Sequence, residues 1–134
     1  MNAVDASREA PAKGRILLVD DEEAVRRVTA RLLQHVGYEV ETARDGQEAV
    51  EMVQADPTRC DVVVLDGSMP RMTGRDAARH IRDLRADLPL VLATGFIDDE
   101  SEDMLATRVF DDVIAKPYDI ASLARVIAAH VARE

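Results

Sequence analysis

The run Val62–Leu65 is the feature that most constrains the fold of this chain. These four consecutive apolar residues are too few for a helix and too apolar for a surface strand, so they predict a strand buried on both faces. Such strands occur mainly in parallel sheets that are covered by helices on both sides. The run ends on a carboxylate, Asp66, which has to be explained as a helix cap, a turn residue or a functional group.

Short apolar runs alternate with helix-like segments along the chain from Arg15 onward. Further strands are predicted at Ile16–Val19, Leu90–Ala93 and Val113–Ala115, and Tyr38, Val40 and Thr42 alternate with two glutamates as in an exposed edge strand. The helices are predicted from apolar residues at helical spacing and from capping residues. Their markers are Val25, Val28, Leu32 and Val36 before Gly37; a capping box at Asp45–Glu48 before a helix through Val53; Ala77, Ile81 and Leu84 as a buried face; an acidic start to a helix near Glu100–Val109; and Asp119 before Ile120, Leu123, Ile127 and Val131.

Five strands alternating with five helices predict an α/β protein with a flavodoxin-like, doubly wound parallel sheet and right-handed crossovers. The first and third strands are fully apolar, whereas the second resembles an edge strand. This pattern favours the strand order 2-1-3-4-5, in which the topological switch point lies between strands one and three. Ligands of such sheets bind at the carboxyl ends of the strands, beside that switch point.

Length and composition limit the number of domains and the classes of partner. Residues 1–13 show no periodicity and are predicted to be a flexible tail or linker, which leaves residues 14–134 as one domain. The net charge of −9 argues against direct nucleic-acid binding, and no apolar run is long enough to cross a membrane. The lone Cys60 cannot form an internal disulfide, which favours a reducing, cytoplasmic location.

Polar residues follow four of the five predicted strands. Taken alone, Asp20 and Asp21 read equally well as helix caps and Asp66 as a turn residue. Together they place three carboxylates at one edge of the sheet, where their mutual repulsion calls for a cation such as Mg²⁺. Thr94, the Gly95 amide and Lys116 come to the same edge and suit phosphoryl oxygens. Lys116 is notable because the chain has 17 basic residues and the predicted domain has no other lysine.

With these residues in place, the chain from about Arg15 to its end resembles the receiver domains of two-component response regulators. The resemblance is carried by an ordered set of residues after the first, third, fourth and fifth strands. The matching residues are Asp20-Asp21, Asp66 with Met69-Pro70 and Gly74, Thr94-Gly95, and Lys116-Pro117.

The resemblance implies a phosphoacceptor rather than an enzyme with a kinase region of its own. Asp66 would take a phosphoryl group from a phosphohistidine of a histidine kinase or histidine phosphotransfer protein, and Thr94 and Lys116 would sense it. The resemblance also implies a cis Lys116–Pro117 bond and a homodimer through the last two helices and the fifth strand. The implied Mg²⁺ ligands are Asp20, Asp21, Asp66 and the Ser68 carbonyl, and the implied phosphoryl-contacting or modulating residues are Gly67, Gly95 and Phe96.

One departure from the family pattern concerns the output mechanism. Receivers carry an aromatic residue three positions before the lysine, and this chain has Val113 there. Phe110 is either a substitute for that aromatic or an ordinary core residue. Phe96, two residues after Thr94, leads to a further hypothesis: its bulk shields the acyl phosphate and slows autodephosphorylation.

Several alternatives stay open on the sequence alone. The receiver could stand alone, or it could be a module of a hybrid histidine kinase, which the stretch from Leu88 to Glu100 resembles. It could be an interaction module that is never phosphorylated. An aspartate-nucleophile phosphohydrolase is disfavoured because Ser68 stands where such enzymes need a second acid. The histidines His35, His80 and His130 fall on three different helices and form no competing site.

Overall fold

The computed structural model describes residues 13–69 and 72–131. Most of the predicted tail therefore lies outside the described residues, as does Pro70 of the Met69-Pro70 pair. Lys13 is described, and its backbone amide donates a hydrogen bond to the Gly37 carbonyl over 2.9 Å. Among the residues that the structure describes, no helix has the length and apolar character needed to cross a bilayer.

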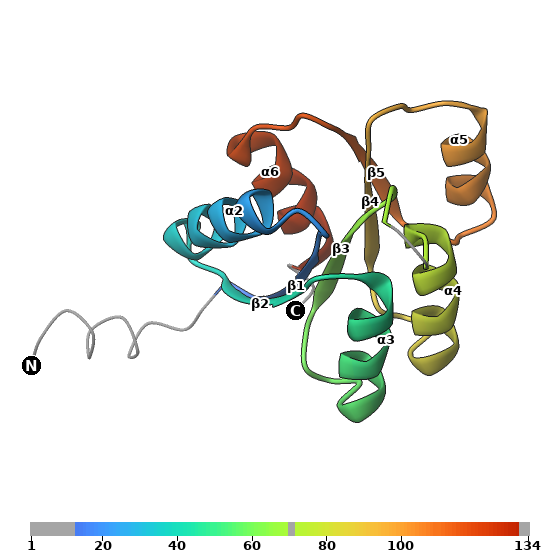
Figure 1. Ribbon diagram of the computed structural model, residues 1–134, viewed down its shortest axis with the longest axis horizontal. Helices are drawn as coiled ribbons and strands as arrows, with labels where there is room; N and C mark the ends of the chain where they lie inside the picture. Colours follow the sequence, from blue (N-terminus) through green and yellow to red (C-terminus); the bar gives the residue numbers. More distant parts are fainter. Residues whose placement is uncertain (1–12, 70–71, 132–134) are drawn as a thin grey trace, which may run out of the picture.

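The fold is a five-stranded parallel sheet in the order β2-β1-β3-β4-β5, which confirms the predicted topology. The strands are β1 (Arg15–Val19), β2 (Glu39–Ala43), β3 (Val62–Asp66), β4 (Leu90–Thr94) and β5 (Asp112–Ala115). The helices between them are α2 (Glu23–Val36), α3 (Gly46–Ala55), α4 (Gly74–Leu84), α5 (Asp99–Ala106) and α6 (Ile120–Val131). Figure 1 shows the strands side by side with helices on both sides.

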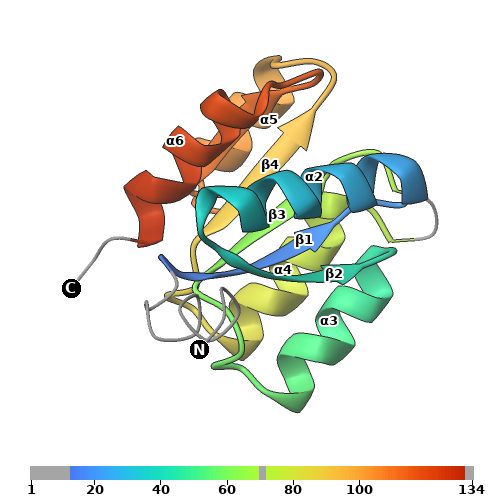
Figure 2. The same cartoon turned by 90° about the vertical axis from the view of Figure 1, so that its left-hand side faces the viewer.

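The helices form two layers, with α2 and α6 on one face of the sheet and α3, α4 and α5 on the other (Figures 1 and 2). Each layer closes its own apolar core. Leu18 and Val64 pack under α2 and α6, whereas Leu17 and Val63 pack under the other three helices. Successive side chains of a strand point to opposite faces, so a strand covered on both sides must be apolar throughout. This explains why Val62–Leu65 has no polar side.

The buried face of α2 is not the apolar stripe that predicted the helix. Its buried residues are Thr29, Ala30 and Leu33, whereas Val28 and Leu32 are 59% and 43% exposed. The helix carries two stripes of residues at helical spacing, and spacing alone cannot tell which stripe faces the sheet. The spacing of Val28 and Leu32 predicted the helix, but these two residues leave an apolar ridge on its surface.

Two expectations fail at helix ends. Leu84, in the last turn of α4, is exposed, and Leu88 in the following loop is buried in the core instead. Helix α5 ends at Ala106 rather than near Val109, because Arg108 has a φ of 63° and turns the chain out of the helical path. The turn directs Phe110 into the core, where it is 1% exposed. This supports the interpretation of Phe110 as a core residue.

The predicted helix caps at Asp45 and Asp119 are present. The Asp45 carboxylate accepts a hydrogen bond from the Glu48 amide over 2.8 Å, and the Asp119 carboxylate accepts one from the Ser122 amide over 2.7 Å. The Glu48 carboxylate in turn accepts a hydrogen bond from the Arg44 amide, one residue before the cap. Helix α3 continues two residues past Val53, to Ala55.

Candidate functional site

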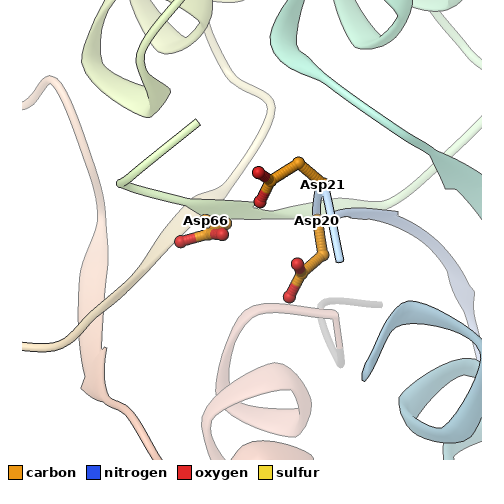
Figure 3. Close-up of side chains that lie close together, drawn as sticks. All are labelled: Asp20, Asp21 and Asp66. Atoms are coloured by element: carbon orange, nitrogen blue, oxygen red, sulfur yellow. The ribbon is translucent and has the colours of Figure 1, made fainter. Parts of the chain in front are cut away.

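Three carboxylates gather at the carboxyl ends of β1 and β3, which are neighbours at the topological switch point. Asp20 and Asp21 follow β1, and Asp66 is the last residue of β3. One ligand oxygen from each lies within 4.8 Å of the others, and Figure 3 shows the three side chains close together. Asp20 and Asp66 are only 3% and 5% exposed, whereas Asp21 is exposed. Burying two carboxylates side by side is unfavourable without a compensating charge.

Neither aspartate of the first pair acts as the cap of α2. The N-cap residue is Glu22, whose side chain makes no capping hydrogen bond. The Asp20 carboxylate instead accepts a hydrogen bond from the Glu22 amide over 2.9 Å, and the Asp20 carbonyl accepts one from Arg26 over 2.9 Å. These contacts fix the turn between β1 and α2, so the capping interpretation does not explain the acid pair.

The backbone after Asp66 is held close to the strand that precedes it. The Ser68 amide donates a hydrogen bond to the Asp66 carboxylate over 3.2 Å. A Cβ atom at Gly74 would lie 2.7 Å from the Asp66 carbonyl oxygen, and one at Gly67 would lie 3.1 Å from a methyl group of Leu92. Gly74 therefore allows α4 to start directly against the end of β3, which positions Asp66.

Lys116 supplies positive charge at the carboxylate cluster. Its Nζ atom lies 3.5 Å from a carboxylate oxygen of Asp20 and 3.5 Å from one of Asp66. Its backbone amide donates a hydrogen bond to the Thr94 carbonyl over 2.7 Å, which ties the end of β5 to the end of β4. The Lys116–Pro117 bond is cis, as the resemblance implied.

The electrostatics of the cluster follow from burial and from these charges. Burial raises the pKa of Asp66, as do the charge of Asp20 and the side chain of Asp21, and these effects outweigh the Ser68 amide and Lys116, which lower it. Burial acts to lower the pKa of Lys116, but the charges of Asp66 and Asp20 outweigh it and raise that pKa overall. The lysine is therefore held in its charged form, whereas the charged form of Asp66 is disfavoured by its surroundings.

Thr94 lies at the end of β4, beside the residue that follows Asp66. A Cβ atom at Gly67 would lie 3.9 Å from the Thr94 Cβ. The Thr94 hydroxyl donates to the Phe96 carbonyl over 3.0 Å and accepts from the Phe96 amide over 3.3 Å. A Cβ atom at Gly95 would meet no other atom within 4 Å, so nothing crowds the loop there. Phe96 itself is 81% exposed.

The structure adds two residues that the sequence did not single out. Arg26 binds the Asp20 carbonyl, and Tyr118 lies near Asp20 and Lys116. Burial raises the pKa of Tyr118, while a hydrogen bond with the buried Thr29 of α2 lowers it in part. The only sequence signal for either residue is a tyrosine two positions after Lys116, and this signal is too weak to have identified Tyr118 as part of the site.

The remaining sequence candidates lie elsewhere or are inert. His35 and His80 are exposed, and His130 lies 3.2 Å from the Asp112 carboxylate, at the opposite end of β5 from Lys116. Burial raises the pKa of the Cys60 thiol to about 11, so little reactive thiolate forms at neutral pH. Val113 pairs with Leu92 of β4 and is partly buried in the core under α4 and α5.

The donor set of the cluster fits a hard divalent cation. Within the described ranges, Asp20, Asp21 and Asp66 are the only group of three or more acidic, histidine or cysteine side chains with ligand atoms this close together. All of its ligand atoms are carboxylate oxygens, the type that Mg²⁺ prefers. Asp21 is exposed and leaves the cluster open to solvent. The donor set therefore suits a divalent cation, and its open side leaves the cluster accessible from solvent.

Comparison with known proteins identifies the family. Residues 16–128 match the family described as response regulator receiver domain. The response regulator MprA of Mycobacterium leprae is 40% identical over 125 residues, which are 89% of this chain and 51% of that protein. The chain spans about half or less of the length of the first curated relatives that it matches.

Solved structures agree with this match. The chemotaxis protein CheY4 of Vibrio cholerae is 30% identical and has a TM-score of 0.80, covering 90% of this chain and 99% of that one. The response regulator TrrA of Thermotoga maritima, solved in complex with Mg²⁺ and BeF, is 30% identical with a TM-score of 0.74. That match covers 86% of this chain and 96% of TrrA.

Proposed function

This chain belongs to the response regulator receiver domain family, and we propose that it is a phosphoryl-accepting signalling domain in which Asp66 is the phosphoacceptor. The observation that carries the proposal is the position of Asp66, which is buried beside two further carboxylates and 3.5 Å from Lys116. A structural role alone gives no reason to bury like charges together at the switch point of the sheet.

The proposed reaction is an in-line phosphoryl transfer. A carboxylate oxygen of Asp66 forms a bond to the phosphorus of a phosphohistidine, and the bond from phosphorus to the imidazole nitrogen breaks. The electron pair of that bond stays on the imidazole nitrogen, so the product is an aspartyl phosphate and a free histidine. Such a transfer needs positioning and charge neutralisation more than chemistry by other side chains.

The other residues of the site have distinct proposed roles. Lys116 neutralises the phosphoryl group, since its Nζ already lies against both Asp66 and Asp20. Asp20, Asp21, Asp66 and the Ser68 carbonyl would hold Mg²⁺. When bound, this ion supplies positive charge to the phosphoryl oxygens. The hydroxyl of Thr94 turns toward the phosphoryl group, and Gly67 and Gly95 border it.

We place the docking surface for the phosphodonor on α2. Ala24, Val28 and Leu32 recur every fourth residue, so they form one ridge that begins one turn after the acid pair. The ridge borders a shallow groove of about 360 Å³ that Arg27 and Arg31 also line. A donor that delivers a phosphoryl group to Asp66 must cover this end of the molecule. An amphipathic helix with an apolar stripe and acidic flanks fits the ridge.

Phosphorylation of Asp66 is tested by incubating the protein with Mg²⁺ and acetyl phosphate. We expect one phosphoryl group per chain, stable in acid and labile in base, as seen by intact mass. Asp66→Asn should abolish the adduct, whereas Asp103→Asn, an exposed site on α5, should leave it unchanged. No adduct on the unmodified protein would favour a receiver-shaped interaction module, and rapid turnover of varied phosphoesters would favour a hydrolase.

The docking surface is tested by comparing two phosphodonors. Leu32→Asp should slow transfer from a phosphorylated histidine phosphotransfer protein at least tenfold while leaving phosphorylation by acetyl phosphate unchanged, because Leu32 lies on α2 away from Asp66. A matched substitution on the opposite layer, Leu84→Asp, should affect neither reaction. Equal slowing with both donors would place Leu32 in the chemistry rather than in docking.

Other features remain proposals about context. We assign residues 14–134 to the receiver domain and residues 1–13 to a flexible tail or linker, and we place the protein in the cytoplasm with its kinase. The last two helices and the fifth strand, α5, β5 and α6, are the proposed surface for a homodimer. The proposed chemistry applies equally to a separate receiver and to one within a longer protein such as a hybrid histidine kinase.

A further inference from the structure

Phe96 is the most exposed of the large apolar side chains in the part of the chain that the structure describes, at 81%. It lies in the loop between β4 and α5, two residues after Thr94. An exposed phenyl ring is unfavourable in water, and its place beside the phosphoacceptor site calls for an explanation.

A cavity next to this ring has the size and lining to receive it. The cavity has a volume of about 440 Å³ and lies between the start of α4 and the start of α5. Leu92 and Met104 form its apolar part, Ser68 and Thr94 border it on the side of Asp66, and Phe96 lies on its edge. A pocket with a buried apolar part and a polar rim is suited to one aromatic side chain.

Val113 does not line this cavity, but it lies beside Leu92, which does. Val113 pairs with Leu92 across β4 and β5, and both belong to the core under α4 and α5. An aromatic residue at position 113 would point from the same face of the sheet and cover Leu92. Valine is too short to do so.

The Thr94 hydroxyl holds Phe96 in its exposed position. This hydroxyl both accepts a hydrogen bond from the Phe96 amide and donates one to the Phe96 carbonyl. A hydroxyl that donates its one proton to a phosphoryl group on Asp66 must give up the hydrogen bond to the Phe96 carbonyl, which frees that side of the loop. Gly95, which joins the two residues, has open space around it, so the loop is free to change its path.

We propose that Phe96 moves into the cavity between α4 and α5 when Thr94 turns to a phosphoryl group on Asp66. This inference rests on the proposed function, since the phosphoryl group is what draws the hydroxyl away. Phe96 then takes over the role of an inward-moving aromatic that Val113 cannot fill, and the signal leaves the site through the β4–α5 loop rather than through β5.

The rim of the cavity presents little obstacle to this movement. Arg75 of α4 and Glu100 of α5 form an ion pair across it over 3.2 Å, with Glu100 exposed and Arg75 partly exposed. Exposed pairs of this kind are weak, so the pair can open and close again over the inserted ring. The surface between α4 and α5 therefore changes from one with a protruding phenyl ring to one without it, which a partner can distinguish.

Fluorine NMR tests the inference with the native side chain. The chain has two phenylalanines, so labelling with 4-fluorophenylalanine gives two resonances, and the buried Phe110 is an internal reference. Phe96→Leu assigns the signals. Without ligand, the Phe96 resonance should shift between H₂O and D₂O as an exposed ring does. With Mg²⁺ and beryllofluoride, a phosphoryl mimic, that solvent shift should fall to the value of Phe110.

The same spectra separate failure of the inference from failure of the proposed function. Signals of bound beryllofluoride with an unchanged, solvent-exposed Phe96 would overturn the inference alone. Absence of bound beryllofluoride would overturn the proposed function and the inference with it. Two variants serve as controls. Thr94→Ala, which removes both contacts that hold Phe96, should bury Phe96 even without beryllofluoride, whereas Val113→Tyr, which fills the cavity from β5, should leave Phe96 exposed when beryllofluoride is bound.

If Phe96 is buried with beryllofluoride in Val113→Tyr as well, the ring goes elsewhere and the assigned cavity is wrong. If it stays exposed in ligand-free Thr94→Ala, the threonine hydroxyl is not what holds the ring outside the cavity. Circular dichroism on both variants checks that the fold is retained.

Discussion

The carboxylate cluster predicts that Asp66→Asn makes the metal-free protein more stable. Lys116 attracts Asp66 over 3.5 Å, which at an effective dielectric constant of 20 gives about 5 kcal/mol. Asp20 and Asp21 repel it from within 4.8 Å, which gives at least about 3.5 kcal/mol each, or about 7 kcal/mol together. The charges alone therefore leave about 2 kcal/mol of net repulsion.

Two corrections act on this figure in opposite directions. Asp21 is exposed, so water screens its repulsion, whereas burial of the Asp66 charge adds a desolvation cost. We therefore expect Asp66→Asn to raise the free energy of unfolding by about 1 to 2 kcal/mol in EDTA at neutral pH. Asparagine keeps the size of the side chain and an oxygen to accept the hydrogen bond from the Ser68 amide.

The effect should depend on pH with a defined sign. Burial and the neighbouring acids raise the pKa of Asp66 in the folded state above its value in the unfolded chain. The folded state then binds a proton more readily, so the unfavourable contribution of Asp66 is full above its folded-state pKa, shrinks as the pH falls below that value, and is gone below the pKa of Asp66 in the unfolded chain. The advantage of Asp66→Asn over the unmodified protein should shrink over that range.

Urea denaturation followed by circular dichroism measures these differences. Asp103→Asn, an exposed change in the middle of α5, corrects for lowering the net charge of −9 by one unit. Saturating Mg²⁺ should reverse the order, since at a hundredfold excess over its dissociation constant a ligand adds about 2.7 kcal/mol to the protein that binds it. The reasoning fails if Asp66→Asn is no more stable than Asp103→Asn in EDTA, or if the difference persists on acidification.

Three further predictions concern the surroundings of the site. Arg82→Ala should lower the free energy of unfolding by about 2 to 4 kcal/mol, because Arg82 donates hydrogen bonds to three backbone carbonyls and to the Asp111 carboxylate. Urea denaturation measures this loss, and a loss no larger than that of the exposed Arg79→Ala would contradict the prediction. Gly74→Ala should lower the free energy of unfolding by about 1 to 3 kcal/mol and slow phosphorylation by acetyl phosphate, because its Cβ would press on the Asp66 carbonyl. Gly95→Ala should leave both the free energy of unfolding and the phosphorylation rate nearly unchanged. Phe96→Ala should shorten the half-life of the aspartyl phosphate, followed by intact mass after removal of the donor; an unchanged half-life would show that Phe96 does not shield it.

Much of the fold was predictable because the strands are short, apolar and bounded by clear signals. The buried run Val62–Leu65 and the alternating Tyr38–Thr42 distinguish a central strand from an edge strand. Parallel crossovers have one favoured hand, so these two observations were enough to order the sheet. The juxtaposition of Asp20, Asp66 and Lys116 followed from that order, because the carboxyl ends of parallel strands meet at one edge.

Side-chain burial at the margins was not predictable in the same way. Val28 and Leu32 have the same apolar character as Leu33, and only packing against the sheet places Leu33 inside and the other two outside. The early end of α5 depends on the left-handed conformation of Arg108, a residue type that gives no local signal for it. In both cases the deciding energy comes from contacts between segments far apart in the sequence.

The sequence by itself determined the layout of the sheet and which polar residues reach its functional edge, because hydrophobic periodicity and chain connectivity are local properties of the chain. Only the tertiary structure decided how those residues are engaged. The Thr94 hydroxyl binds Phe96 in this state, and a cavity lies beside Phe96, lined in part by Leu92 and Met104. Such features depend on distances between elements and on the space that side chains leave unfilled, which no pattern within a single segment encodes.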